Sequence, residues 1–201
     1  MLQEKLKQHT ATLHDQLEQL MYVNHIMQRT LTPLQYNKLL MINYLVHEAY
    51  EQRIFDAIGE DLAKKLNLPA RSKLKALTAD LASQHIDSQN FSKVIAPLKA
   101  KIPDSAFALG AMYVLEGATL GGSVIVKQLK LNANFSPQKN FSYYGVYGAQ
   151  LIPNWQQFLT VLNAIPEKNH QQAMNGAKFM FNEIAAVATQ LTNSTINQFN
   201  S

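Results

Sequence analysis

The longest apolar stretch of the chain, residues 106–126, constrains its fold more than any other feature. It reads AFALGAMYVLEGATLGGSVIV and is long enough to cross a membrane as a helix. Glu116 lies at its centre, where a charge is costly in lipid, and glycine, serine and threonine dilute its apolar character. The neighbouring segments have the amphipathic pattern of soluble helices. We therefore interpret residues 106–126 as a buried central helix and expect no membrane association.

Three glycines in this helix need an explanation. A glycine inside a helix costs about 1 kcal/mol relative to alanine, so Gly117, Gly121 and Gly122 together cost on the order of 3 kcal/mol. Close packing of a neighbouring helix would offset that cost, and so would close approach of a flat ligand over which the helix kinks. Spacing alone does not separate the two explanations. Gly117 and Gly121 are four residues apart and share a face, so they predict one flat surface.

The rest of the chain also has helical periodicity, and no alternation typical of strands is convincing. Thr32, Pro33 and Gln35 form a helix start with a capping box, and Gly59 is a stop signal after Ile58. We expect helices over residues 2–21, 33–58, 71–86, 91–99, 103–131, 153–164 and 167–191, with a long aromatic loop over 132–152. The prediction is a compact all-α domain over 1–191, followed by a polar, frayed tail over 192–201.

Composition narrows the possible functions. The chain has no cysteine, which excludes disulfides, thiolate metal sites, iron–sulfur clusters and a cysteine nucleophile. The N-terminus lacks a signal-peptide segment, so a cytoplasmic location is expected. The net charge is +4, and the densest basic positions are Lys64, Lys65, Arg71, Lys73 and Lys75. We interpret these as solvated helix faces rather than a nucleic-acid patch, although a basic surface suits an anionic small molecule or an acidic redox partner.

His14 lies at the edge of the apolar face of the first predicted helix. Helical spacing places Lys7, Thr10, His14 and Glu18 on one strip beside the core stripe. An imidazole with a carboxylate one turn away is the layout of a metal ligand whose second ring nitrogen is held by an acceptor. Taken alone, a histidine at such an edge is more often structural.

Taken together, the His14 segment and the glycine-containing central helix resemble the heme oxygenase family. The first match is Thr-x-x-x-His-x-x-x-Glu at Thr10, His14 and Glu18, and the second is YVLEGATLGG over residues 113–122, similar to the distal helix of bacterial members. The pattern AKFMF over residues 177–181 resembles the last helix of the family. The resemblance extends over about residues 6–185 and includes Tyr144, Gly145, Trp155 and Phe158.

The resemblance implies an all-α fold that holds heme b between a proximal and a kinked distal helix. His14 then corresponds to the iron ligand, and Glu18 to the group that orients its other ring nitrogen. Gly117, Gly121 and Gly122 correspond to the distal wall, which restricts where dioxygen meets the porphyrin edge. The remaining cofactor-binding positions are Lys7 for a propionate, Thr10, Tyr113, Thr119, Lys127 and Phe181, which lines the pocket.

The chain departs from the family pattern on the distal side. Ala118 stands where many members have an aspartate, so protons would come through water held by other groups such as Thr119 or backbone carbonyls. Ser123 stands where an arginine is common, and residues 155–162 lack the basic positions that hold propionates in animal members. Lys127 or Lys130 would then hold a propionate, which leaves the biliverdin isomer open.

Other chemistries have weaker support. A di-iron bundle needs two Glu-x-x-His units, and the chain has one, Glu167 to His170, so we interpret this pair and the His47, Glu48 and Glu51 group as surface helix residues. No serine elbow or phosphate-binding glycine loop is evident.

Three functions follow, in order. The first is a biliverdin-forming heme oxygenase that releases carbon monoxide and ferrous iron, uses dioxygen, and receives electrons from a ferredoxin or an NADPH-dependent reductase. The second is a heme carrier with the same fold, suggested by Ala118 and the missing basic residues. The third is a helical interaction module without a ligand. Nothing in the sequence requires more than a monomer.

Overall fold

The structure is a computed structural model that describes residues 1–88, 98–135 and 140–199. All regular structure in these ranges is helical, which confirms the predicted all-α class. The short helix expected over 91–99 lies almost wholly outside the described residues. The elements are α1 Leu2–Leu20, α2 Val23–Met27, α3 Pro33–Ile58, α4 Glu60–Leu66, η1 Leu68–Arg71, α5 Leu74–Ser83, α6 Ser105–Leu120, α7 Gly122–Leu131, η3 Ala133–Phe135, η4 Gly148–Gln150, α8 Leu151–Asn163, η5 Glu167–Asn169 and α9 His170–Phe199.

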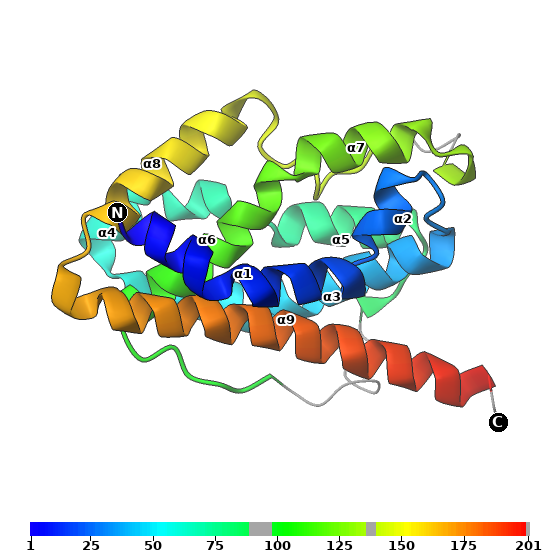
Figure 1. The fold of residues 1–201 in the computed structure, drawn as a ribbon. Coiled ribbons are helices and arrows are strands. Elements are labelled where there is room, and N and C mark those ends of the chain that lie inside the picture. The colour runs from blue at the N-terminus through cyan, green and yellow to red at the C-terminus, as the bar shows by residue number, and fades with distance from the viewer. Residues whose placement is uncertain (89–97, 136–139, 200–201) are drawn as a thin grey trace.

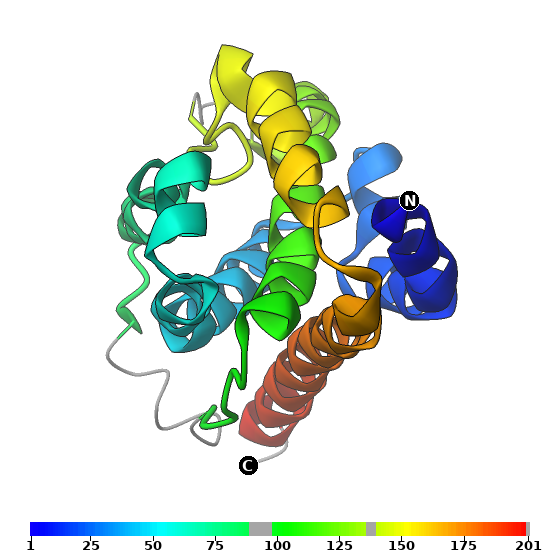
Figure 2. The same cartoon turned by 90° about the vertical axis from the view of Figure 1, so that its left-hand side faces the viewer.

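Helix α6 runs through the middle of the molecule, as predicted for the apolar run. It packs most extensively on α9 and also contacts α3, α7 and α8 (Figures 1 and 2). Ser105–Leu131 is long and apolar enough to span a membrane, and half of its apolar window is buried inside the domain. The core helix of a soluble protein has the same properties, so the segment carries no inference of a membrane span.

Two glycines allow α6 and α9 to cross closely. A Cβ on Gly110 would lie 1.8 Å from the carbonyl oxygen of Ala173, and one on Gly176 would lie 2.0 Å from that of Phe107. No side chain fits at either position without moving the backbone. The central crossing therefore depends on glycine in both helices.

Several predicted boundaries are confirmed. The Thr32 hydroxyl accepts a hydrogen bond from Gln35 N–H, with Pro33 at the start of α3, and α3 ends at Gly59 with φ of +85°. Asp104 caps α6 by accepting from Phe107 N–H.

Other boundaries differ from the prediction. The segment expected as one helix to Leu131 is divided at Gly121, which keeps helical angles (φ −70°, ψ −17°) while α6 ends and α7 begins. Helix α5 spans Leu74–Ser83 only, since η1 includes Arg71 before it and His85 has a φ of +56° after it. Helix α9 continues past Leu191 to Phe199, so residues 192–199 are helical rather than an irregular tail. The domain boundary at residue 191 stays a prediction.

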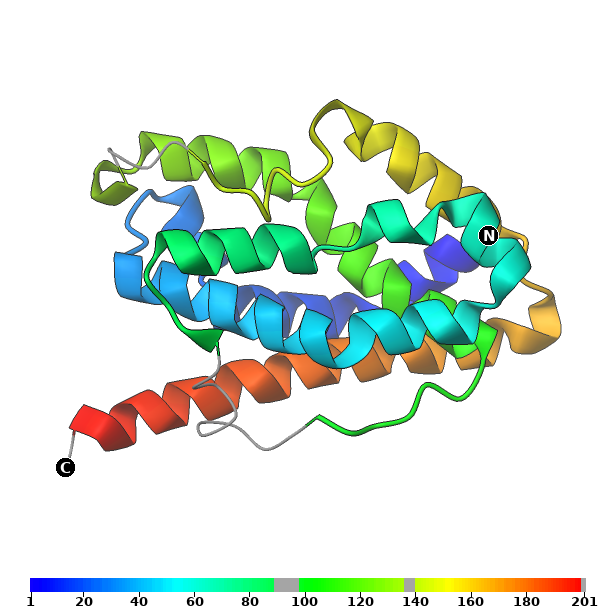
Figure 3. The ribbon, with the colours of Figure 1, turned by 180° about the vertical axis from the view of Figure 1, so that it is seen from behind.

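The long helices α3 and α9 form one side of the molecule (Figures 1 and 3). Helix α1 packs on α9, and α5 packs on α3. Among the described residues α1 and α6 both pack extensively on α9 but not on each other. The first helix and the central helix are therefore held side by side by a shared neighbour.

Candidate functional site

His14 lies on the exposed side of α1. Its side chain is 59% exposed, and its Nδ1 atom lies 3.7 Å from Glu18 Oε1 and 4.0 Å from Asp15 Oδ1. These are ion-pair distances that are too long for hydrogen bonds. In the part of the chain that the structure describes, His14, Asp15 and Glu18 are the one group of three side chains close enough to share a metal ion. The imidazole is thus accessible and is not tied to a strong partner.

Of the other residues predicted for the proximal side, Phe181 is the one that contacts His14 among the contacts of the described residues. The ring of Phe181, from α9, lies 6.1 Å from the His14 ring in an edge-on arrangement and is buried. Lys7 is exposed two turns before His14. Thr10 is buried, and its hydroxyl donates to the Leu6 carbonyl at 2.8 Å, so this hydroxyl is used within α1.

The three predicted distal glycines have different surroundings. A Cβ on Gly117 would first meet the Trp155 ring at 3.8 Å, and one on exposed Gly121 would first meet Ile125 at 3.8 Å. A Cβ therefore makes only ordinary van der Waals contacts at both positions. A Cβ on Gly122 would lie 2.1 Å from the Tyr144 carbonyl oxygen, so Gly122 is required by backbone packing. We name Gly117 and Gly121 the glycine ridge.

The remaining predicted distal residues are less directly placed. Tyr113 is half-buried, with its ring 5.8 Å from that of Trp155, and burial raises its pKa. Thr119 is buried, and its hydroxyl donates to the Glu116 carbonyl at 2.6 Å. Lys127 is exposed on α7. Ala118, at the position of the missing aspartate, is also exposed.

Helices α1 and α6 both pack on α9 (Figure 2). Two cavities among the described residues lie elsewhere, and neither His14 nor the glycine ridge lines either of them. One of these cavities lies beside Arg53 and the 99–102 segment. The other is small and lies behind α6, within a buried network of charged side chains.

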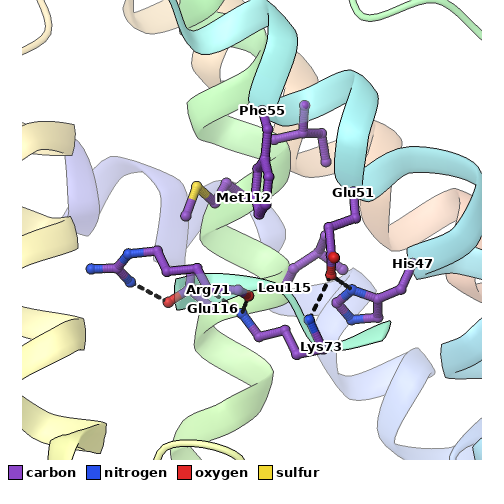
Figure 4. A pocket seen from close by; sticks show the side chains of 9 residues that line it. His47, Glu51, Phe55, Arg71, Lys73, Met112, Leu115 and Glu116 are labelled. Carbon is purple, nitrogen blue, oxygen red and sulfur yellow. Dashed lines mark hydrogen bonds and ion pairs between the residues drawn. The ribbon is translucent and has the colours of Figure 1, made fainter. Parts of the chain in front are cut away.

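Glu116 is at the centre of that network (Figure 4). Its carboxylate is 2% exposed and accepts hydrogen bonds from Arg71 Nη1 at 2.5 Å, from Lys73 Nζ, and from Tyr147 Oη at 2.8 Å. We name Glu116, Arg71, Lys73 and Tyr147 the back clamp. Burial lowers the pKa of Lys73, and the nearby Glu116 carboxylate partly opposes that shift. Burial raises the pKa of Tyr147, and Glu116 raises it further.

His47 and Glu51 form the second half of the network. His47 Nδ1 lies 2.7 Å from Glu51 Oε2, and Glu51 also accepts from Lys73 N–H at 2.9 Å and from the Ser72 hydroxyl. Burial lowers the pKa of His47 despite its carboxylate partner. Burial works to raise the pKa of Glu51, but His47, Lys73 N–H and Ser72 outweigh it and hold that pKa below 4.5. We therefore assign a neutral His47 whose Nδ1–H donates to an ionised Glu51.

This assignment balances the buried charges. Two carboxylates, Glu51 and Glu116, face two cations, Arg71 and Lys73, and a neutral imidazole adds none. His47 Nε2 has no partner among the described residues. The cavity beside it has a volume of about 10 Å³ that the centre of a water molecule can occupy, which is room for about one water.

The network corrects two predictions. Arg71 and Lys73 are 2% exposed rather than on a solvated face, and His47 and Glu51 are 1% and 4% exposed rather than on a helix surface. The sequence carried one signal for this: a glutamate at the centre of an apolar run needs a buried cation. The sequence did not reveal which cation, because Arg71 and Lys73 precede α5 and are far from Glu116 along the chain.

The predicted Glu167 and His170 pair is separate from both groups. Lys5 Nζ lies 3.2 Å from Glu167 Oε1 and 3.4 Å from His170 Nδ1. His170 Nε2 lies 3.1 Å from the Ile165 carbonyl oxygen. These contacts join the start of α9 to α1, which supports a structural role.

Comparison with known proteins adds to this geometry. The model of the heme oxygenase family matches residues 1–190. The chain belongs to the heme oxygenase family. Crystal structures of the NO- and CO-bound heme oxygenase from Neisseria meningitidis match this family member with a TM-score of 0.70 and 20% sequence identity, over 95% of this chain and 92% of that one. At this identity the similarity shows a common fold. A comparison with curated proteins finds no match.

Proposed function

We propose that the protein is a heme oxygenase that cleaves heme to biliverdin, carbon monoxide and ferrous iron, using dioxygen and external electrons. One observation carries the proposal. An exposed imidazole on α1 and an exposed glycine on α6–α7 belong to two segments that share α9 as a neighbour without packing extensively on each other. Family membership supports heme as the ligand of this pair, because the chain belongs to the heme oxygenase family and has its fold.

The residues present fit heme. His14 is accessible, weakly held and next to the buried Phe181 ring, as a ligand that must turn toward iron requires. Gly117 and Gly121 leave open the space that side chains would otherwise fill. When bound, heme supplies both the iron that activates dioxygen and the porphyrin that is oxidised.

Each residue then has a defined task. His14 would bind the iron, and Glu18, whose Oε1 lies 3.7 Å from His14 Nδ1, would hold the second ring nitrogen. The glycine ridge allows close approach of the backbone to the distal face. Lys7 and Lys127, both exposed, pair with propionates.

The distal side offers solvent as the source of protons. Ala118 and Gly121 are exposed, and the Thr119 hydroxyl is engaged with the Glu116 carbonyl. Water that reaches the exposed ridge therefore replaces the acid of other members. The electron donor is a ferredoxin or an NADPH-dependent reductase, and we propose a cytoplasmic monomer.

The second candidate is a heme carrier with the same fold, favoured by Ala118 in place of an acid. One experiment separates the two. Purified protein is mixed with hemin, and ascorbate is added in air while the spectrum is recorded. Loss of the Soret band with growth of the broad red absorbance of biliverdin supports the oxygenase, whereas a stable Soret band supports the carrier. Absence of a Soret shift on mixing would contradict both.

A further inference from the structure

We infer that the back clamp of Glu116, Arg71, Lys73 and Tyr147 positions the glycine ridge, and that Tyr147 is a positioning residue for the oxidation reaction. The inference rests on the proposed function for its relation to heme. The clamp itself is a property of the heme-free protein. It surrounds Glu116, the one charged residue of α6, which is buried and lies next to Gly117 in the sequence.

The clamp and the ridge lie on different sides of one helix. Successive residues of an α-helix are about 100° apart around the axis. Gly117 is thus about 100° from Glu116, and Gly121 is about 140° from it. Met112 and Leu115 line the small cavity with Glu116 and share its side of α6. Hydrogen bonds to Glu116 on one side of the helix therefore fix how far Gly117 and Gly121 project on the other side.

Three hydrogen-bond donors hold Glu116 from separate segments. Arg71 is in η1, Lys73 precedes α5, and Tyr147 precedes η4. Arg71 also donates to the Leu66 and Asn154 carbonyls, which joins α4 and α8 to the same point. Five surrounding segments are thereby joined at one turn of α6.

A second contact holds the far end of the ridge. The Tyr144 carbonyl lies against Gly122, and three residues later Tyr147 bonds to Glu116. This loop is tied to α5 because Asp80 accepts the N–H groups of Ser142 and Tyr143 at 2.9 Å each. The loop therefore contacts the α6–α7 segment at Glu116 and at Gly122, the two ends of the glycine ridge.

The front of the ridge has no comparable support. A Cβ on Gly117 or Gly121 would meet only ordinary contacts at 3.8 Å. Because Gly117 and Gly121 are not held on their own side of the helix and Glu116 is held on the other, the clamp sets the distance between the glycine ridge and the proposed heme. A change in that height alters which porphyrin edge is accessible to dioxygen.

Tyr147→Phe tests this role because it removes one hydroxyl and leaves the ring. That hydroxyl accepts from Lys73 and donates to Glu116, so both bonds are lost. Tyr50→Phe is the matched control, since it removes a tyrosine–carboxylate bond of 2.5 Å to Glu183, between α3 and α9. The first measurement is amide hydrogen exchange of the heme-free proteins, and the second is the ratio of biliverdin isomers after turnover.

Tyr147→Phe is expected to accelerate exchange in residues 117–122 about tenfold relative to residues 106–112. It is also expected to change the isomer ratio, whereas Tyr50→Phe does neither. Equal exchange profiles in the two variants would overturn the clamp, and an unchanged isomer ratio would overturn its effect on the reaction. Failure of wild-type protein to form biliverdin removes the proposed function, and the exchange profile then decides the clamp alone.

Discussion

Gly122 and Tyr144 are in backbone contact, because a Cβ on Gly122 would lie 2.1 Å from the Tyr144 carbonyl oxygen. Its neighbour Gly121 has no such contact, and the nearest atom to a Cβ there is Ile125 Cδ1 at 3.8 Å. Adjacent glycines in one motif thus have different reasons to be glycine. The first is required by the fold, and the second is free for a ligand.

Alanine substitutions should separate these two reasons. Gly122→Ala forces the 142–147 loop away from α7 and is expected to lower the free energy of unfolding by on the order of 3 kcal/mol. Gly121→Ala has helical backbone angles and open space, so it is expected to be neutral or to stabilise by about 0.5 kcal/mol. Urea unfolding of the heme-free proteins measures both. Equal losses in the two variants would contradict the assignment.

The back clamp predicts that two substitutions compensate each other. Glu116→Gln leaves the buried cations Arg71 and Lys73 facing only Glu51, and is expected to cost about 3–5 kcal/mol. Lys73→Met in addition restores the balance of charge, so the double variant is expected to be more stable than Glu116→Gln alone. The measurement is a double-mutant cycle of unfolding free energies. Additive losses would show that the two residues do not share one charge network.

Local sequence signals predicted the helices well. The capping box at Thr32 and the stop at Gly59 act within one turn of the backbone, so neighbouring residues specify them. The change of direction at Gly121 (Figure 1) agrees with the kinked distal helix that the family resemblance implied, but the glycine pattern did not single out Gly121, because its backbone angles remain helical.

The arrangement of the candidate residues was predictable only where they are close in sequence, and their roles toward heme stay predictions. His14 and Glu18 are one helical turn apart, and the ridge glycines are four residues apart, so helical spacing places each pair. The back clamp joins residues from η1, α6 and the 140s loop, and no local pattern relates them. Charged residues also gave the wrong expectation of exposure, because lysine and arginine are rarely buried without partners.

His47 predicts a pH dependence of stability. Burial lowers its pKa in the folded protein, so the unfolded chain takes up a proton near 6.5 that the folded protein resists. Its contribution is fully present above pH 6.5 and is lost as pH falls through its lower folded pKa. Glu51, with a pKa below 4.5 in the folded protein, adds a second loss as pH falls below that value.

The measurement is urea unfolding of wild type and His47→Gln at pH 8.5, 7.5, 6.5 and 5.5. Between pH 6.5 and 5.5 the wild type is expected to lose up to about 1.4 kcal/mol more than the variant, the value for one proton. The two proteins are expected to have parallel curves above pH 7.5. A variant with the full wild-type slope below 6.5 would place the titrating group elsewhere.

His14 and Gly121 provide the last prediction, which addresses the proposed heme site from its two sides. His14 and Gly121 are both exposed, so His14→Ala and Gly121→Leu are expected to change the free energy of unfolding of the heme-free protein by less than about 1 kcal/mol. With hemin, His14→Ala loses the imidazole ligand and is expected to form no biliverdin. Gly121→Leu keeps that ligand but fills the distal space, so the Soret band forms while oxidation slows at least about tenfold.

The control for loss of an imidazole is His9→Ala. His9 is an exposed histidine of α1 whose Nδ1 lies 2.9 Å from the Lys5 carbonyl oxygen. Ring cleavage by His14→Ala at the wild-type rate would refute the proximal assignment, and unchanged oxidation by Gly121→Leu would refute the distal one.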